Sequence, residues 1–393
     1  MPLVFVHGVA NRPSDEQAAD IVQRNALFRS ITFENEALTI FNPDWGSHAV
    51  SFTSGLPWLP DPKKIQAFAA GDADQEGGDI GLGPIAKIDG AQAVDLAVFA
   101  ALENAVIEAG KNKQPDLAAD KEVLQFAKAA ADYLAKIVPE ATADPKGVAE
   151  LAGSTDQEFT DALGAELQSA LSNDLQAFGV GDRIRDAVSS LGGWIGNGLS
   201  DTALRAKRRS LSQSTALFLG DIFVYLRQRK VEGPTGTAAR LFEPILIDLV
   251  KAAKDKRAAD EPFVVVGHSL GGVLLFDILT DETCLSRLRK EVPDFKIDAL
   301  VTVGSQPGFF ADLGLYPDQS KNSSGRFERP GSVENWFNVY DYTDVFSFLC
   351  KPFFEGVDDF GYDTKVDLLQ AHSAYFKRPS FYKRLQARLK TLS

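Results

Sequence analysis

Cysteines and long apolar runs are both scarce in this chain of 393 residues. Its two cysteines, Cys284 and Cys350, are too few for the disulfide framework of a secreted scaffold. No window shows about 20 consecutive apolar residues, the length that a membrane-spanning helix needs. The best candidate, residues 94–109, is interrupted by three acids, and residues 3–6 look like a buried strand rather than part of a cleaved signal. We therefore predict a cytoplasmic protein without a transmembrane segment.

Positive charge is also in deficit, since 41 Lys and Arg residues stand against 54 Asp and Glu, for a net charge of -13. Such a chain repels a phosphate backbone, which argues against nucleic acid as its main partner. The basic groups at 205–209 and 377–390 could contact a membrane peripherally, but solvated helix faces are the interpretation we favour. The acids at 72–79 lack the spacing of a calcium loop, so we predict no metal and no cofactor.

Short apolar runs, rich in β-branched residues, predict the strands of an α/β fold. They are nearly continuous, as in strands buried on both faces of a parallel sheet, and lie at 3–6, 37–41, 263–266, 299–303 and 336–340. Helical patterns, including 241–250 and 273–279, separate the later runs. We predict a mostly parallel sheet flanked by helices.

Between residues 51 and 214 the strand signal disappears and helical spacing replaces it. Apolar residues recur every three or four positions at 159–178 and at 123–137, which is typical of amphipathic helices. A connection this long is unusual inside a compact domain. We predict a catalytic core made of residues 1–50 and 215–393, interrupted by a helical cap at 51–214.

The strongest local signal is the run Gly267-His268-Ser269-Leu270-Gly271, placed between an apolar strand and a helical pattern. A serine on a sharp strand-to-helix turn needs small residues two positions before and after it, because larger side chains would clash where the backbone folds back. The pattern therefore predicts that Ser269 is a nucleophile, with Gly267, His268 and Gly271 supporting the turn.

A serine nucleophile needs a base, and the chain has four histidines. His268 adjoins the serine and should point elsewhere, while His7 and His48 follow the first two predicted strands. Elimination leaves His372, although a surface histidine on a helix is the alternative.

The base in turn needs an orienting carboxylate. Asp341 and Asp344 both follow the predicted strand at 336–340. We prefer Asp344, because it stands farther into the loop and can reach across to a histidine; Asp341 is the alternative, with a turn-forming role otherwise.

Acyl transfer also requires backbone N–H groups aimed at the developing oxyanion. The Leu270 N–H, directly after the nucleophile, is one candidate. The second is the N–H of Val9, because His7-Gly8-Val9 follows the first strand and Gly8 permits close backbone approach. We assign His7 a loop-stabilising role.

The chain resembles the lipase-like serine esterases of the α/β-hydrolase superfamily. The resemblance rests on motifs in family order: Val4-Phe-Val-His-Gly8, Val266-Gly-His-Ser-Leu-Gly-Gly272, Val301-Thr-Val-Gly-Ser-Gln-Pro307, Asn338-Val-Tyr-Asp-Tyr-Thr-Asp344 and His372-Ser-Ala-Tyr375. Segments 44–46 and 220–225 are similar to core-flanking segments of bacterial members. The first strand here carries the oxyanion loop, so the two strands that commonly precede it are absent and a trimmed sheet is expected.

These residues predict an enzyme that cleaves carboxylic esters of lipids or other acyl compounds through an acyl-enzyme. Two alternatives stay open: a peptidase, amidase or thioesterase with the same triad, and an interaction protein with a relic hydrolase core.

Overall fold

The protein's computed structural model describes residues 2–52, 90–119, 215–227, 237–255, 261–366 and 370–392, together with single positions at 124–132 and at 229. The core of this part of the chain is a six-stranded sheet in the order β2-β1-β3-β4-β6-β8. Its strands are β1 (Pro2–Val6), β2 (Thr39–Phe41), β3 (Val264–His268), β4 (Ile297–Val303), β6 (Val333–Tyr340) and β8 (Val357–Gly361). Each neighbouring pair is parallel, which confirms the α/β prediction.

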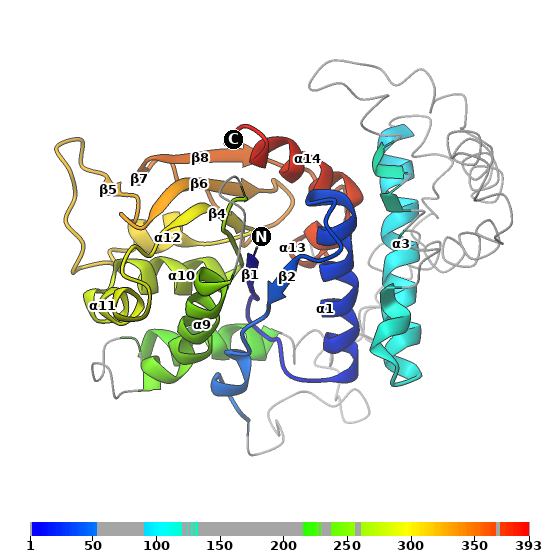
Figure 1. The fold of residues 1–393 in the computed structure, drawn as a ribbon, viewed down its shortest axis with the longest axis horizontal. Helices are drawn as coiled ribbons and strands as arrows, with labels where there is room; N and C mark the ends of the chain where they lie inside the picture. Colours follow the sequence, from blue (N-terminus) through cyan, green and yellow to red (C-terminus); the bar gives the residue numbers. More distant parts are fainter. Residues whose placement is uncertain are drawn as a thin grey trace, which may run out of the picture.

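Helices cover both faces of the sheet (Figure 1). One face carries α1 (Asp15–Leu27), the short α13 (Ala371–Ala374) and α14 (Pro379–Leu389); the other carries α9 (Thr237–Lys254), α10 (Leu270–Thr280), α11 (Glu282–Glu291) and α12 (Pro307–Asp312). Strand β1 shows why the sheet needs two covers. Leu3 and Phe5 pack into one hydrophobic cluster and Val4 and Val6 into the other, because successive side chains of a strand point to opposite faces.

All five predicted strands are present, but the sequence missed β8 at the edge of the sheet. Its sequence, Val-Asp-Asp-Phe-Gly, carries two acids where a central strand would be apolar. An edge strand tolerates such residues because it is less covered. The two-residue strands β5 (Phe327–Glu328) and β7 (Phe354–Glu355), which form a second small sheet, were also not predicted.

One described part of the predicted cap lies against the core. Helix α3 (Gly90–Lys111) packs on α1, and its apolar side chains belong to the same hydrophobic cluster as Leu3 and Phe5 (Figure 1). Gln23 of α1 donates hydrogen bonds to the carbonyls of Leu102 (2.8 Å) and Ala118 (2.9 Å). Residues 53–89 and 133–214 and several positions at 120–129, including the 159–178 stripe and most of the 123–137 stripe, lie outside the described residues, so the cap stays a prediction.

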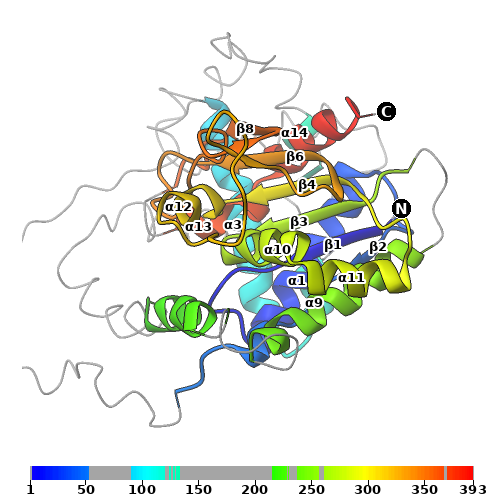
Figure 2. The same cartoon turned by 90° about the vertical axis from the view of Figure 1, so that its left-hand side faces the viewer.

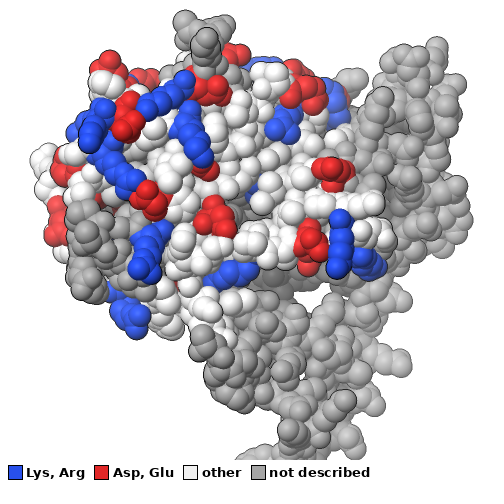
Figure 3. All heavy atoms as spheres, turned by 60° about the horizontal axis from the view of Figure 1, so that its bottom comes forward, with Lys and Arg blue, Asp and Glu red and all other residues white. Residues whose placement is uncertain are grey.

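The charges on the described surface are mixed. Over the face drawn in Figure 3, Lys and Arg side chains are interspersed with Asp and Glu, and neither sign forms a continuous patch among the described residues. On the C-terminal basic run, Lys377 pairs with Asp20 (3.2 Å) and Lys383 with Asp132 (2.9 Å). No helix in the described ranges is both long and apolar enough to cross a bilayer.

Candidate active site

Ser269 occupies a sharp turn between β3 and α10. Its backbone has φ 53° and ψ -130°, a conformation that non-glycine residues rarely adopt. The turn is held from β4, because the Ser269 N–H donates to the Val303 carbonyl (3.0 Å) and the Ser305 hydroxyl donates to the Ser269 carbonyl (2.6 Å). This strain at a held position is typical of a functional residue.

The glycines on either side of Ser269 are required by close backbone approach. A Cβ at Gly267 would lie 2.7 Å from the Cα of Gly272. A Cβ at Gly271 would collide with the backbone carbonyl of Val6, at the end of β1. The turn therefore has the small neighbours that the sequence argument demanded.

His372 joins the serine to a carboxylate. It lies in α13, and its Nε2 is 2.8 Å from Ser269 Oγ. Its Nδ1 is 2.9 Å from Oδ2 and 3.0 Å from Oδ1 of Asp344, in the loop after β6. Parallel strands bring the three residues together, since β3 and β6 both end at the edge of the sheet beside α13 (Figure 2).

Asp344 is buried and accepts hydrogen bonds from several sides. Besides His372, the Phe346 N–H donates to Oδ1 (2.9 Å) and the Tyr375 hydroxyl to Oδ2 (2.9 Å). Burial acts to raise the pKa of Asp344, but the hydrogen bond and charge of His372, with these two donors, outweigh it and lower the pKa below its ordinary value. Asp344 is therefore an ionised acceptor at neutral pH.

Asp341, the alternative acid, bonds within its own loop and to Thr364, which follows β8. It accepts hydrogen bonds from the backbone N–H of Thr343 (2.8 Å) and of Thr364 (2.7 Å), and from both threonine hydroxyls. This is the turn-forming role that the sequence analysis gave to whichever aspartate does not contact the histidine. Of the two, Asp344 makes that contact.

Sequence reasoning gave no role to two residues that shape the Asp344 environment. Tyr375 follows His372 by three positions and so can reach the same carboxylate. Gly304, directly after β4, has φ +55°, and a Cβ there would lie 2.9 Å from Asp344 Oδ2. The helical spacing could have suggested Tyr375, whereas the need for glycine at 304 depends on the three-dimensional contact.

The His268 ring lies 5.0 Å from that of His372, centroid to centroid, and also contacts the His372 backbone. Its Nε2 lies 2.8 Å from the carbonyl oxygen of His372. Burial, followed by the nearby His372, lowers the pKa of His268 to about 3, so the ring is neutral. A neutral ring bonded in this way donates its Nε2–H and ties the α13 backbone to the nucleophile turn.

The His7-Gly8-Val9 loop lies directly beside Ser269. A Cβ at Gly8 would fall 2.6 Å from the Cβ of Ser269. The buried His7 ring stacks on Trp45 at a centroid distance of 5.0 Å, and its Nδ1 lies 2.8 Å from the Gly8 carbonyl. Burial lowers the pKa of His7 to about 4, so it supports the loop as a neutral donor. Val9 thus follows a glycine in contact with Ser269, while Leu270 begins α10.

Aromatic rings flank the imidazole. The ring centroids of Phe346 and Phe218 are 5.3 Å and 6.0 Å from that of His372, and 4.4 Å from each other. Phe346, Val345 and Leu349 are each at least 39% exposed. Apolar surface therefore surrounds the histidine side of the triad.

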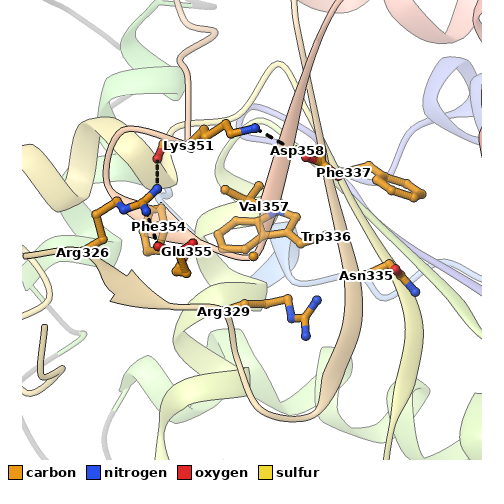
Figure 4. A pocket seen from close by; sticks show the side chains of 11 residues that line it. Arg326, Arg329, Asn335, Trp336, Phe337, Lys351, Phe354, Glu355, Val357 and Asp358 are labelled. Atoms are coloured by element: carbon orange, nitrogen blue, oxygen red, sulfur yellow. Dashed lines mark hydrogen bonds and ion pairs between the residues drawn. The ribbon is translucent and has the colours of Figure 1, made fainter. Parts of the chain in front are cut away.

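A separate cavity of about 320 Å³ lies beside residues 335–337 of β6 and the first residues of β8, toward the amino ends of these two strands (Figure 4). Five of its eleven lining residues are charged, and two ion pairs lie among them, between Arg326 and Glu355 and between Lys351 and Asp358 (3.7 Å). Because Ser269 and Asp344 follow the ends of their strands, this cavity is not part of the triad.

Among the described residues, no group of three or more His, Cys, Asp or Glu side chains is placed to hold a metal ion. Comparisons with protein-family models, with curated proteins and with solved structures found no match to this chain. A function for the site therefore has to be inferred from its own residues.

Proposed function

We propose that the protein is a serine hydrolase with an α/β-hydrolase core that cleaves carboxylic esters. The observation that carries the proposal is the continuous chain of hydrogen bonds from Asp344 through His372 to Ser269. Its serine stands on a strained turn at the carboxyl edge of a parallel sheet, where substrates of such sheets bind.

The hydrogen bonds assign a role to each residue. Asp344 is an acceptor, so His372 carries its proton on Nδ1 and leaves Nε2 free to accept from the Ser269 hydroxyl. Ser269 Oγ then attacks the ester carbonyl while His372 takes the hydroxyl proton. The histidine returns that proton to the leaving alcohol, and a water molecule, activated by the same base, hydrolyses the acyl-enzyme.

The N–H groups of Val9 and Leu270 are the proposed oxyanion donors. Gly8 brings the first loop against Ser269, and Leu270 is its immediate neighbour. Donors held by the backbone stabilise the tetrahedral intermediate without reorganisation, and each contributes about 10²–10³ in turnover.

The apolar surroundings of His372 favour esters with an apolar chain, such as acyl or lipid esters. Phe218 and Phe346 flank the ring that protonates the leaving group. The complete hydrogen-bonded triad disfavours the relic interpretation, since a relic would have no reason to retain it. The peptidase, amidase and thioesterase alternatives differ from the proposal only in the bond that is cleaved, because amides and thioesters would use the same residues.

A fluorophosphonate probe tests the proposal, because it reacts with activated serines. Mass spectrometry of the labelled protein should place the adduct on Ser269, and Ser269→Ala should abolish labelling. Ser324→Ala, in an exposed loop, is the matched control and should label at the wild-type rate. A series of p-nitrophenyl esters, amides and thioesters then distinguishes the bond classes. Failure of the wild-type protein to label or to cleave any of these compounds would overturn the proposal.

A further inference from the structure

The helical segment 215–227 lies at the carboxyl edge of the sheet, as the bright green helix at the lower left of Figure 2. It contacts the site from two directions. Phe218 packs near His372, while Asp221, on the next turn, reaches the loop after β1. Gly220 allows this close packing, because a Cβ there would lie 2.9 Å from Val50 Cγ1.

Asp221 is fully buried and both of its oxygens are used. Oδ2 accepts from the Ala10 N–H (2.8 Å) and from Arg12 Nη1 (3.1 Å). Oδ1 accepts from the Val50 N–H (3.0 Å) and from Arg12 Nη2 (2.5 Å). One carboxylate thus connects the loop after β1 to residue 50 and to the helical segment.

The hydrogen bond from Ala10 to Asp221 matters because Val9, the proposed oxyanion donor, directly precedes Ala10. The peptide unit between Val9 and Ala10 is held at both polar atoms: its N–H donates to Asp221, and its carbonyl accepts from Asn11 Nδ2 (3.0 Å). Asn11 also donates to the Gly8 carbonyl (3.0 Å). With these three atoms fixed, the orientation of the Val9 N–H is fixed as well.

Ala10 has φ 61°, in the left-handed region that disfavours a residue with a side chain. Such a conformation persists only where its surroundings impose it. The bonds from Asp221 and Asn11 supply that constraint.

We propose that Asp221 is a positioning residue for the oxyanion loop, acting through Ala10 to aim the Val9 N–H at the oxyanion. The proposal rests on the proposed function. Its chemistry is not that of the triad, because Asp221 touches no reacting atom.

The test compares Asp221→Asn with Asp277→Asn. Asp277 anchors the same stretch of chain to α10 through the Tyr225 hydroxyl and Arg229 Nη2 (2.7 Å), so its loss weakens that anchor without touching the oxyanion loop. In Asp221→Asn, an amide NH₂ replaces one of the two carboxylate oxygens, each of which accepts a hydrogen bond from a backbone N–H and from Arg12. The NH₂ group cannot accept these bonds. The loop should therefore lose its fixed orientation.

For Asp221→Asn we expect kcat for a short soluble ester to fall by about 10–10², with KM within about threefold, because only transition-state binding is weakened. The affinity for a trifluoromethyl ketone, whose adduct with Ser269 carries an oxyanion, should fall by a similar factor. Asp277→Asn should keep kcat and ketone affinity within about threefold of wild type, even if its melting temperature falls as far as that of Asp221→Asn.

Asn11→Ala provides the second variant should Asp221→Asn fail to fold, because it removes the other anchor of the same peptide units. It should show the same loss of kcat and of ketone affinity. Wild-type kcat and ketone affinity in a folded Asp221→Asn, or equal losses in Asp277→Asn, would overturn the role of Asp221. Neither result touches the triad, which the wild-type labelling of Ser269 reports independently.

Discussion

The central sheet has a carboxyl edge, where its parallel strands end, and an amino edge, where they begin. Both edges carry charged residues but use them differently. At the carboxyl edge, Asp344 is 2% exposed, accepts hydrogen bonds from three donors and has a lowered pKa. At the amino edge, Lys351 and Asp358 pair at 3.7 Å with both side chains 62% exposed. Exposed pairs are screened by water and contribute little, whereas a buried carboxylate must be satisfied by directed bonds. The comparison teaches that function should depend on the bonds of the carboxyl edge and hardly at all on the amino edge.

Removing the nucleophile or the base should give the largest effect. Ser269→Ala and His372→Ala are each expected to lower turnover by about four to six orders of magnitude, and the double variant little further, because the triad acts as a unit. Single-turnover and steady-state ester hydrolysis measure this. Losses that add in the double variant would contradict a shared mechanism.

Exchanging the two aspartates for asparagine should come next. Asp344→Asn is expected to cost about four orders of magnitude in turnover while the protein stays folded, since the orienting carboxylate is lost. Asp341→Asn should keep turnover within about tenfold and lower the free energy of unfolding by about 1–3 kcal/mol, because Asp341 bonds only its own loop and Thr364. Turnover and melting temperature, measured on both variants, check the pair; the reverse pattern would exchange their roles.

The sequence predicts those features of the carboxyl edge that depend on neighbouring residues in the chain, and it misses those that depend on contacts between distant ones. The turn around Ser269 and five of the six strands of the main sheet are local patterns, so apolar runs and glycine spacing predict them. Elimination among the four histidines pointed to His372, and the position of Asp344 farther into its loop favoured it over Asp341. The roles of Gly304 and Asp221 were missed, because each depends on a contact with a residue far away in the sequence. Strand β8 was missed because Asp358 and Asp359 interrupt its apolar pattern.

The apolar rim of the carboxyl edge should affect substrate choice more than chemistry. Phe346→Ser keeps the backbone N–H that donates to Asp344 but removes the ring beside His372. We expect kcat/KM for long-chain esters to fall by about 10–10², as one or two lost apolar contacts imply, and for acetate esters by less than about threefold. Leu313→Ser, 55% exposed at the end of α12, is the control and should leave the chain-length profile unchanged. Equal losses for short and long esters would place Phe346 in the chemistry instead.

Acidification should destabilise the carboxyl edge through His7. Its folded-state pKa is about 4 because burial disfavours the charged ring, against an ordinary value of 6.5. Between these values the unfolded state binds more protons, so stability falls as the pH drops from about 6.5 to about 4, by up to about 1.4 kcal/mol per pH unit. His7→Asn, whose amide can donate to the Gly8 carbonyl without titrating, should reduce the slope of melting temperature against pH in this window, and the part of the slope due to His268, whose pKa is also lowered, should remain. An unchanged slope would mean that His7 is not held neutral.

The smallest effect is expected at the amino edge. Lys351→Ala removes one member of the exposed pair with Asp358 at the cavity of Figure 4. Because both side chains are solvated, the free energy of unfolding should change by no more than about 0.5 kcal/mol, and added salt should not alter the difference much. Ester turnover should equal that of the wild type, since neither Ser269, His372 nor Asp344 lines the cavity. Chemical denaturation and steady-state kinetics check both values. A loss of turnover in this variant would show that the two edges are coupled through β6, and the contrast between them would no longer hold.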